Sequence, residues 1–125
     1  MALAQRNLEA RETRHLIAAD KVEGTTAYNR AGEKLGRIES FMVDKIAGQA
    51  EYAVMSFGGL FGLGGNHYPI PWDMLDYDPG KGGYVVDLDK ERLAKGPSFS
   101  PGEEPDFDRA YGRTVCDYYG VVYAW

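Results

Sequence analysis

Three glycine-containing turns, set between segments rich in β-branched and aromatic residues, constrain this chain more than any other feature of its sequence. The turns are residues 29–33 (NRAGE), 44–48 (DKIAG) and 78–83 (DPGKGG). Such spacing is typical of sequential strands joined by tight connections. The strand candidates are residues 25–28, 35–44, 50–57, 67–71, 75–78 and 83–88. Because no helix intervenes between them, the sequence predicts a mainly β fold, a small and partly closed antiparallel barrel.

Details within the strand candidates indicate where each lies in the sheet. The 50–57 candidate carries apolar residues on both faces, which predicts a central strand; they are Tyr52, Ala53, Val54, Met55 and Phe57. The alternation slips by one residue between Ile38 and Phe41, which predicts a β-bulge and a bent strand. Pro69 and Pro71 share one face and cannot donate to a ladder, so we expect their strand at an edge of the sheet.

The C-terminal region has a different pattern, and it divides the chain into three parts. A polar, proline-containing linker spans residues 95–105, and aromatic and apolar residues then recur at helical spacing. We expect Asp106 to cap this helix and Gly120 to end it. The helical positions are Phe107, Tyr111, Val115 and Tyr118 or Tyr119. We therefore divide the chain into an N-terminal polar segment (1–15), a barrel domain (16–99), and a linker with an aromatic helix and tail (100–125).

An aromatic tail of this kind needs a surface to cover. We favour docking on its own chain or on a symmetric copy over docking on a different partner, because a docked terminal helix is the commoner use of such a pattern.

Composition and charge argue against several classes of partner and site. The net charge is −5 and no stretch concentrates Lys or Arg, which argues against direct nucleic-acid binding. One cysteine, Cys116, cannot form an internal disulfide or by itself hold zinc, and it fits a reducing cytoplasm. No segment approaches the roughly 20 apolar residues that a membrane span requires. We expect a cytoplasmic protein with no membrane span.

A glycine-rich segment, residues 58–65 (GGLFGLGG), raises the question of phosphate binding. No lysine follows it as a P-loop requires, and the next residues must be extended rather than helical. Its apolar members are Leu60, Phe61 and Leu63. Two interpretations remain open: these residues fold back over the open end of the barrel, or they form a self-association or partner patch. Burial of the loop in a symmetric dimer would satisfy both.

No set of residues has the arrangement of a catalytic, metal or cofactor site. Asp76, Asp78 and Asp87 only faintly imitate a calcium loop, because Lys81 stands where that loop needs glycine. We prefer a β-turn there. The two histidines, His15 and His67, have no nearby partner ligands. We expect a protein that is not an enzyme and has no cofactor.

The order and spacing of many short motifs resemble the PRC-barrel family, which is named for the cytoplasmic domain of the photosynthetic reaction centre H subunit. The motifs are Val22-x-Gly24-Thr25, Tyr28-Asn29-x-x-Gly32-Glu33-Lys34-Leu35-Gly36, Ile38, Val43-Asp44-Lys45, Gly48, Tyr52-Ala53-Val54, Phe57-Gly58-Gly59, Pro71-Trp72, Leu75, Tyr77 and Gly83-Tyr84-Val85-Val86-Asp87-Leu88. The resemblance covers about residues 16–99, and Asp117-Tyr118-Tyr119-Gly120 is similar to an extension of stand-alone bacterial members. It implies a small barrel used for binding and assembly.

The leading hypothesis is a non-enzymatic protein-binding and assembly module that self-associates as a homodimer or meets another protein. Its candidate interaction residues are Leu60, Phe61, Leu63, Tyr68, Trp72, Tyr118, Tyr119 and Trp125. One alternative is a ribosome or RNA-assembly accessory factor, by analogy to the PRC-containing maturation factor RimM. Another is a small-ligand-binding barrel with Tyr68, Trp72 and Tyr77 at its mouth.

Overall fold

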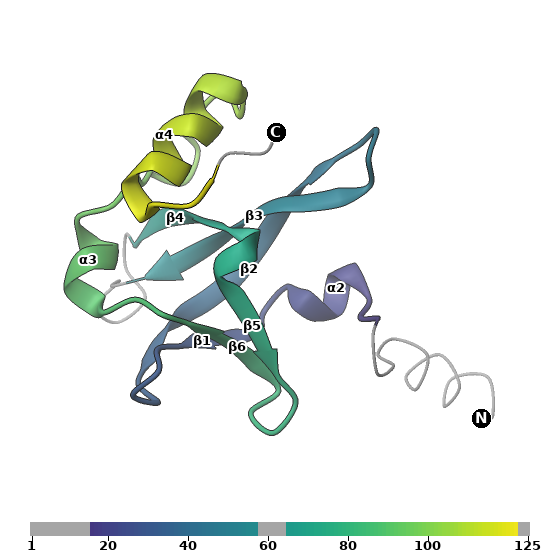
Figure 1. Cartoon of the computed structure of the whole chain (residues 1–125), viewed down its shortest axis with the longest axis vertical. Helices are drawn as coiled ribbons and strands as arrows, with labels where there is room; N and C mark the ends of the chain where they lie inside the picture. The colour runs from purple at the N-terminus through teal and green to yellow at the C-terminus, as the bar shows by residue number, and fades with distance from the viewer. Residues whose placement is uncertain (1–15, 58–64, 123–125) are drawn as a thin grey trace.

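The computed structural model of the chain describes residues 16–57 and 65–122, which form one curved sheet with short helices packed on it (Figure 1). Its elements are α2 (Ala19–Val22), β1 (Thr26–Tyr28), β2 (Lys34–Asp44), β3 (Gln49–Phe57), β4 (Asn66–Pro71), the 3-10 helix η2 (Trp72–Met74), β5 (Leu75–Asp78), β6 (Gly83–Val86), α3 (Lys90–Ala94) and α4 (Arg109–Tyr119). The six-stranded sheet forms a half-barrel, so the mainly β, partly closed fold with a C-terminal helix is confirmed.

The strand order in this sheet is β4-β3-β2-β1-β6-β5, and one pairing departs from expectation. Neighbouring strands are antiparallel except β1 and β6, which run parallel with Ala27 beside Tyr84 and Tyr28 beside Val85. The expectation of a purely antiparallel barrel is wrong for this pair. The chain passes through β2, β3, β4, η2 and β5 before β6 returns beside β1, and this long connection allows the parallel direction.

Irregularities in β2 and the position of β4 follow the sequence signals. The register between β2 and β3 shifts between Ile38 and Ser40, which confirms the predicted bulge, and shifts again between Met42 and Val43. Strand β4 lies at one end of the sheet, as its prolines predicted. Its outer side is covered at one point by a two-bond bridge in which His67 and Phe99 exchange backbone hydrogen bonds of 2.8 and 2.9 Å.

Helices α3 and α4 cover one part of the sheet and complete its larger core. Leu93 of α3 and Val115 of α4 are fully buried there with Met55 and Ile70. A smaller core lies beside α2, where Val22 packs with Ile38, Ala53 and Tyr84. Helices α2 and α3 were not predicted, because four or five residues are too few to show helical periodicity.

The ends of α4 show one corrected and one confirmed prediction. Asp108, rather than Asp106, is the N-cap, and its carboxylate accepts a hydrogen bond of 2.9 Å from the Tyr111 N–H. Asp106 lies two residues earlier, too far from the first free N–H groups of the helix. Gly120 ends the helix with a φ of 70°, as its sequence position predicted.

Candidate protein-interaction surface

The outer part of the β2–β3 hairpin projects beyond the rest of the sheet (Figure 1), and we call residues 42–52 the hairpin arm. Its turn is fixed locally, because the Asp44 carboxylate accepts hydrogen bonds of 2.9 Å from Ile46 N–H and 3.0 Å from Ala47 N–H. This turn leaves the Ile46 side chain 96% exposed, and Val43 is 46% exposed. Two branched apolar side chains therefore project into solvent on a well-defined support.

A cavity of about 530 Å³ lies between the hairpin arm and the start of α4, and we call it the arm groove. Its lining residues are Met42, Val43, Asp44, Lys45, Ile46, Glu51, Tyr52, Phe107 and Arg109. Apolar and aromatic side chains supply much of this lining, and two acidic and two basic residues complete it. An apolar surface rimmed by charges has the character of a protein-binding site.

A chain of aromatic contacts connects the groove to α4. The Phe107 ring lies 5.8 Å from Tyr52 and 5.8 Å from Tyr111, measured between ring centroids. Tyr52 and Tyr111 are 6.4 Å apart and meet edge to face. Edge-to-face packing of this kind favours one arrangement of the rings. The groove wall is therefore set by the docking of α4 on the sheet.

The acidic side of the groove carries an unfavourable charge arrangement. Partial burial, and then the nearby carboxylates of Asp44 and Asp73, raise the pKa of Glu51 above its ordinary value. A group whose charged form is disfavoured in this way would gain from a nearby cation. Asp44 and Glu51 therefore place carboxylates close together on one side of a groove that Lys45 and Arg109 also line.

A smaller cavity of about 140 Å³ lies beside the groove, between Trp72, Glu51 and the C-terminal end of α4. Cys116 lines it, and burial, followed by the carboxylate of Asp117, raises the pKa of the thiol above its ordinary value. A thiol in that state is a poor nucleophile. Cys116 is therefore a partly buried residue whose thiol is poorly activated for nucleophilic attack.

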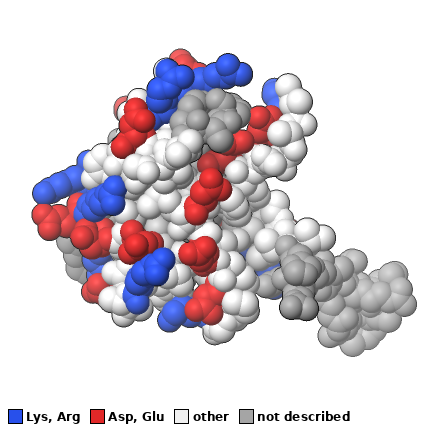
Figure 2. Space-filling view, viewed as in Figure 1, with Lys and Arg blue, Asp and Glu red and all other residues white. Residues whose placement is uncertain are grey.

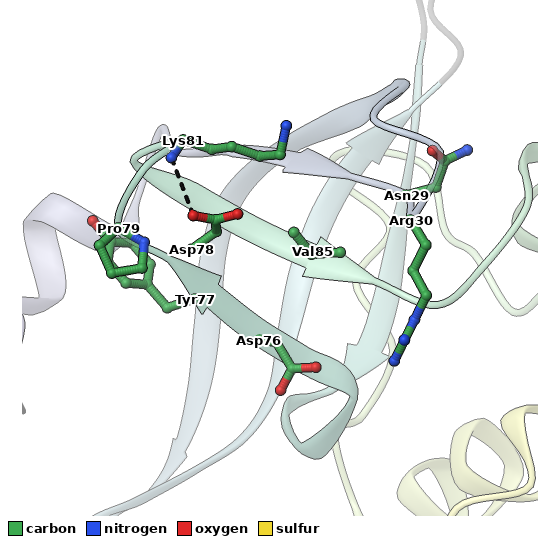
Figure 3. A pocket seen from close by; sticks show the side chains of 8 residues that line it. All are labelled: Asn29, Arg30, Asp76, Tyr77, Asp78, Pro79, Lys81 and Val85. Atoms are coloured by element: carbon green, nitrogen blue, oxygen red, sulfur yellow. Dashed lines mark hydrogen bonds between the residues drawn. The ribbon is translucent and has the colours of Figure 1, made fainter.

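A further hollow lies on the β5–β6 hairpin beside the β1–β2 turn (Figure 3). Both of its cationic side chains have partners in the chain: Arg30 lies 3.6 Å from the Asp87 carboxylate, and the Lys81 ammonium lies 5.1 Å from the Tyr28 ring centroid. The Asp78 carboxylate accepts backbone hydrogen bonds of 2.9 Å from Gly80 and 3.3 Å from Lys81. They brace the β-turn that we preferred over a calcium loop, in which the Lys81 N–H donates a hydrogen bond of 3.1 Å to the Asp78 carbonyl.

The aromatic residues that we nominated for interaction do not gather on one surface. Tyr68 and Tyr119 lie in the larger core, 8% and 5% exposed, so most of each ring packs within the chain. Trp72 packs on Phe41 and Tyr84, with centroid distances of 5.6 and 5.7 Å.

Tyr118 holds α4 to α3 and does not face the arm groove. Its hydroxyl donates a hydrogen bond of 2.5 Å to the Arg92 carbonyl, and the Arg92 guanidinium donates one of 3.2 Å to the Tyr118 carbonyl. The remaining nominated residues, Leu60, Phe61, Leu63 and Trp125, lie outside the described residues.

The three aromatic residues predicted to line the mouth of a ligand-binding barrel belong to two different cores. Tyr68 belongs to the larger core, whereas Trp72 and Tyr77 pack against the smaller one, where Tyr77 lies 5.2 Å from the Tyr84 ring. Side chains such as Ile38, Met55 and Val86 are fully buried within the half-barrel. This filled interior counts against a ligand-binding barrel.

Sequence reasoning did not nominate the residues of the hairpin arm. The available signal was Ile46, a β-branched apolar residue in the middle of an otherwise turn-forming segment, DKIAG. We used that segment only as a turn. Phe107 and Arg109 were assigned to the helix region without regard to the surface that they share with the arm.

Neither a metal-ligand cluster nor an apolar helix of membrane-spanning length occurs in the described parts of the chain. Residues 16–57 and 65–122 contain no group of three His, Cys, Asp or Glu side chains placed to hold a metal ion. In the same residues, no helix has both the length and the apolar character needed to cross a membrane.

Comparison with known proteins gave one family match. The family model described as the PRC-barrel domain matches residues 14–93. Among solved structures, the chain is similar to a 16S ribosomal RNA processing protein, RimM, from Pseudomonas aeruginosa, with 19% sequence identity and a TM-score of 0.40. That match covers 58% of this chain and 44% of the RimM chain, less than half of its length. No curated protein matches the sequence.

Proposed function

The chain belongs to the PRC-barrel family, and we propose that it is a non-enzymatic protein-binding and assembly module that self-associates. In this proposal the arm groove is the binding surface, and the rest of the sheet with α3 and α4 is the scaffold that holds it. The proposal places the protein in the cytoplasm, because a single partly buried cysteine fits a reducing compartment.

The observation that carries the proposal is the exposed apolar surface of the hairpin arm. Ile46 and Val43 are exposed beside a groove that is itself lined by Met42, Tyr52 and Phe107. Apolar surface that a chain presents on a projecting, locally braced element is typical of interaction sites. Scattered single apolar residues would not support the same conclusion.

The charge distribution favours a protein over a nucleic acid as the partner. Lys, Arg, Asp and Glu side chains are interspersed over the face shown in Figure 2, and the chain as a whole carries −5. Phosphate backbones require clustered positive charge. The ribosome-associated alternative stays a prediction, and it can be tested by cosedimentation with ribosomal particles across a series of salt concentrations.

The experiment that tests the proposal is light scattering of the full chain over a range of concentrations. We expect a concentration-dependent dimer for the natural sequence and a shift toward monomer for the Val43→Ser, Ile46→Ser double variant. Leu16→Ser is the matched control, because Leu16 is exposed but does not line the groove. A strict monomer at the highest concentration would contradict self-association.

A further inference from the structure

The hairpin arm carries both an apolar projection and an apolar groove on the same part of the molecule. Ile46 is the most exposed of the large apolar side chains in the described residues, and it stands at the rim of the arm groove. A surface that contains a projection and a matching recess is self-complementary across a twofold axis. Two copies with their arms side by side could each insert Ile46 into the groove of the other.

The charges beside Ile46 fit the same arrangement. Lys45 precedes Ile46 at the tip of the arm, and Glu51 lies on the groove with Asp44 and Asp73 nearby. Lys45 and Arg109 also line the groove, so its acidic side is the part around Glu51. In a twofold pair, the tip of one arm brings a lysine toward the acidic side of the other groove. Opposite charges placed in this way fix the register of an interface.

Contacts within the single chain brace both the arm and the groove wall. The Asp44 carboxylate holds the turn through two backbone hydrogen bonds, and the aromatic contacts of Phe107 hold the groove wall. A pre-organised projection and recess lose little conformational freedom on association. This favours a second copy over a partner that would have to reshape the groove.

From these observations we propose that the arm groove is completed by Ile46 of a second copy of this chain, with Lys45 of that copy facing Glu51. The inference rests on the proposed self-association and names the residues that would carry it.

Two charge-reversal variants test the facing charges. In a twofold pair, Lys45→Glu alone places two acids together at both contacts, and Glu51→Lys alone places two lysines together. A one-to-one mixture restores an opposite-charge pair at both contacts, because each copy supplies one partner of each pair. We expect dimerisation about tenfold weaker for each variant alone and near the natural value for the mixture.

Single-cysteine cross-linking tests the position of Ile46 independently. In a Cys116→Ala background, Ile46→Cys chains are mixed with Arg109→Cys chains, so that every disulfide between the two labels joins different molecules. We expect this link to form several-fold faster than a link between Ile46→Cys and Leu16→Cys chains. Unfolding curves of each variant show whether the fold is retained.

The outcomes separate this inference from the proposed function. Mixture rescue together with preferential 46–109 linking supports the contact. If light scattering shows a dimer but neither mixture rescue nor preferential 46–109 linking is found, the Ile46 contact is overturned and self-association is retained. A monomer at all concentrations, with no preferential link, overturns both.

Discussion

The inner and outer parts of the β2–β3 hairpin contain the same kinds of residue in opposite surroundings. In the inner part, Leu35, Ile38 and Met55 are buried in the two cores, whereas Val43 and Ile46 in the outer part face solvent. The difference comes from what lies over each part: α2, α3 and α4 complete the cores, and the tip of the arm extends past them. Burial here follows topology rather than residue type, so equal substitutions in the two parts should have unequal effects.

The largest effect is expected for Ile38→Ala in the inner part. Ile38 is fully buried, and removing three of its carbon atoms leaves a cavity that should lower the free energy of unfolding by about 3 kcal/mol. Denaturant unfolding measures the change. A loss below about 1 kcal/mol would mean that the inner core relaxes easily, and the contrast between the two parts would fail.

Gly36→Ala tests the close approach of β2 and β3 in the inner part. A Cβ at this position would collide with the backbone carbonyl oxygen of Ser56, which cannot move without disturbing the sheet. We expect a loss of about 2 kcal/mol. Gly48→Ala in the arm is the control without a steric clash. Nothing lies within 4 Å of a Cβ at this position, so only the φ of 73° opposes the substitution. If Gly36→Ala and Gly48→Ala lowered the free energy of unfolding equally, and the β2–β3 contacts were unchanged, the steric argument would be contradicted.

Tyr119→Phe tests the cover that α4 provides over the inner part. The Tyr119 hydroxyl is buried without a hydrogen-bond partner in the described structure, so its removal should raise the free energy of unfolding by roughly 1.5 kcal/mol. Burial also raises the pKa of Tyr119 above its ordinary value.

The raised pKa gives the same variant a pH signature. The unfolded chain releases the Tyr119 proton near pH 10, whereas the folded chain retains it. The free energy of unfolding of the natural sequence should therefore fall as the pH rises above about 10. Tyr119→Phe should reduce this alkaline loss. Unfolding curves at neutral and alkaline pH measure both effects, and an unchanged alkaline slope would contradict the assignment.

Asp108→Ala and Asp106→Ala form a matched pair at the start of α4. Loss of the Asp108 cap should lower stability by about 1 kcal/mol, because the Tyr111 N–H loses its acceptor. The Asp106 variant should change stability by less than about 0.5 kcal/mol. Equal losses would show that the cap is shared.

The smallest effect on unfolding is expected for Ile46→Ala, the counterpart of Ile38→Ala. Because Ile46 is almost fully exposed in the single chain, truncation should change monomer stability by less than about 0.5 kcal/mol. Unfolding measured at a concentration where the chain is monomeric isolates the effect of Ile46→Ala on the single chain. A larger loss there would place Ile46 in the packing of its own chain.

Sequence patterns predicted the local features of the fold well. Turn residues separated the strands, the slip after Ile38 marked the bulge, and Gly120 marked the end of α4. Each depends on a few neighbouring residues, which is why it can be read from the chain. The parallel pairing of β1 with β6 joins residues far apart in sequence and has no local signal.

The candidate surface was harder to predict for the same reason. Tyr68, Tyr119 and Ile46 are all large apolar or aromatic residues, and the first two are buried while the third is exposed. Nothing in the residue types separates them; the arrangement of α4 relative to the sheet does. Asp106 and Asp108 are both suitable caps by type, and backbone geometry decides between them.

The backbone bridge between His67 and Phe99 sets how far α4 can travel. From that anchor, the ten residue steps to Arg109 span at most about 36 Å even when fully extended. So short a tether keeps the helix at an effective concentration near the millimolar range around its own sheet. Exchange of α4 with a second copy would have to compete with that local concentration, and so two copies can associate through their arms while each keeps its own helix.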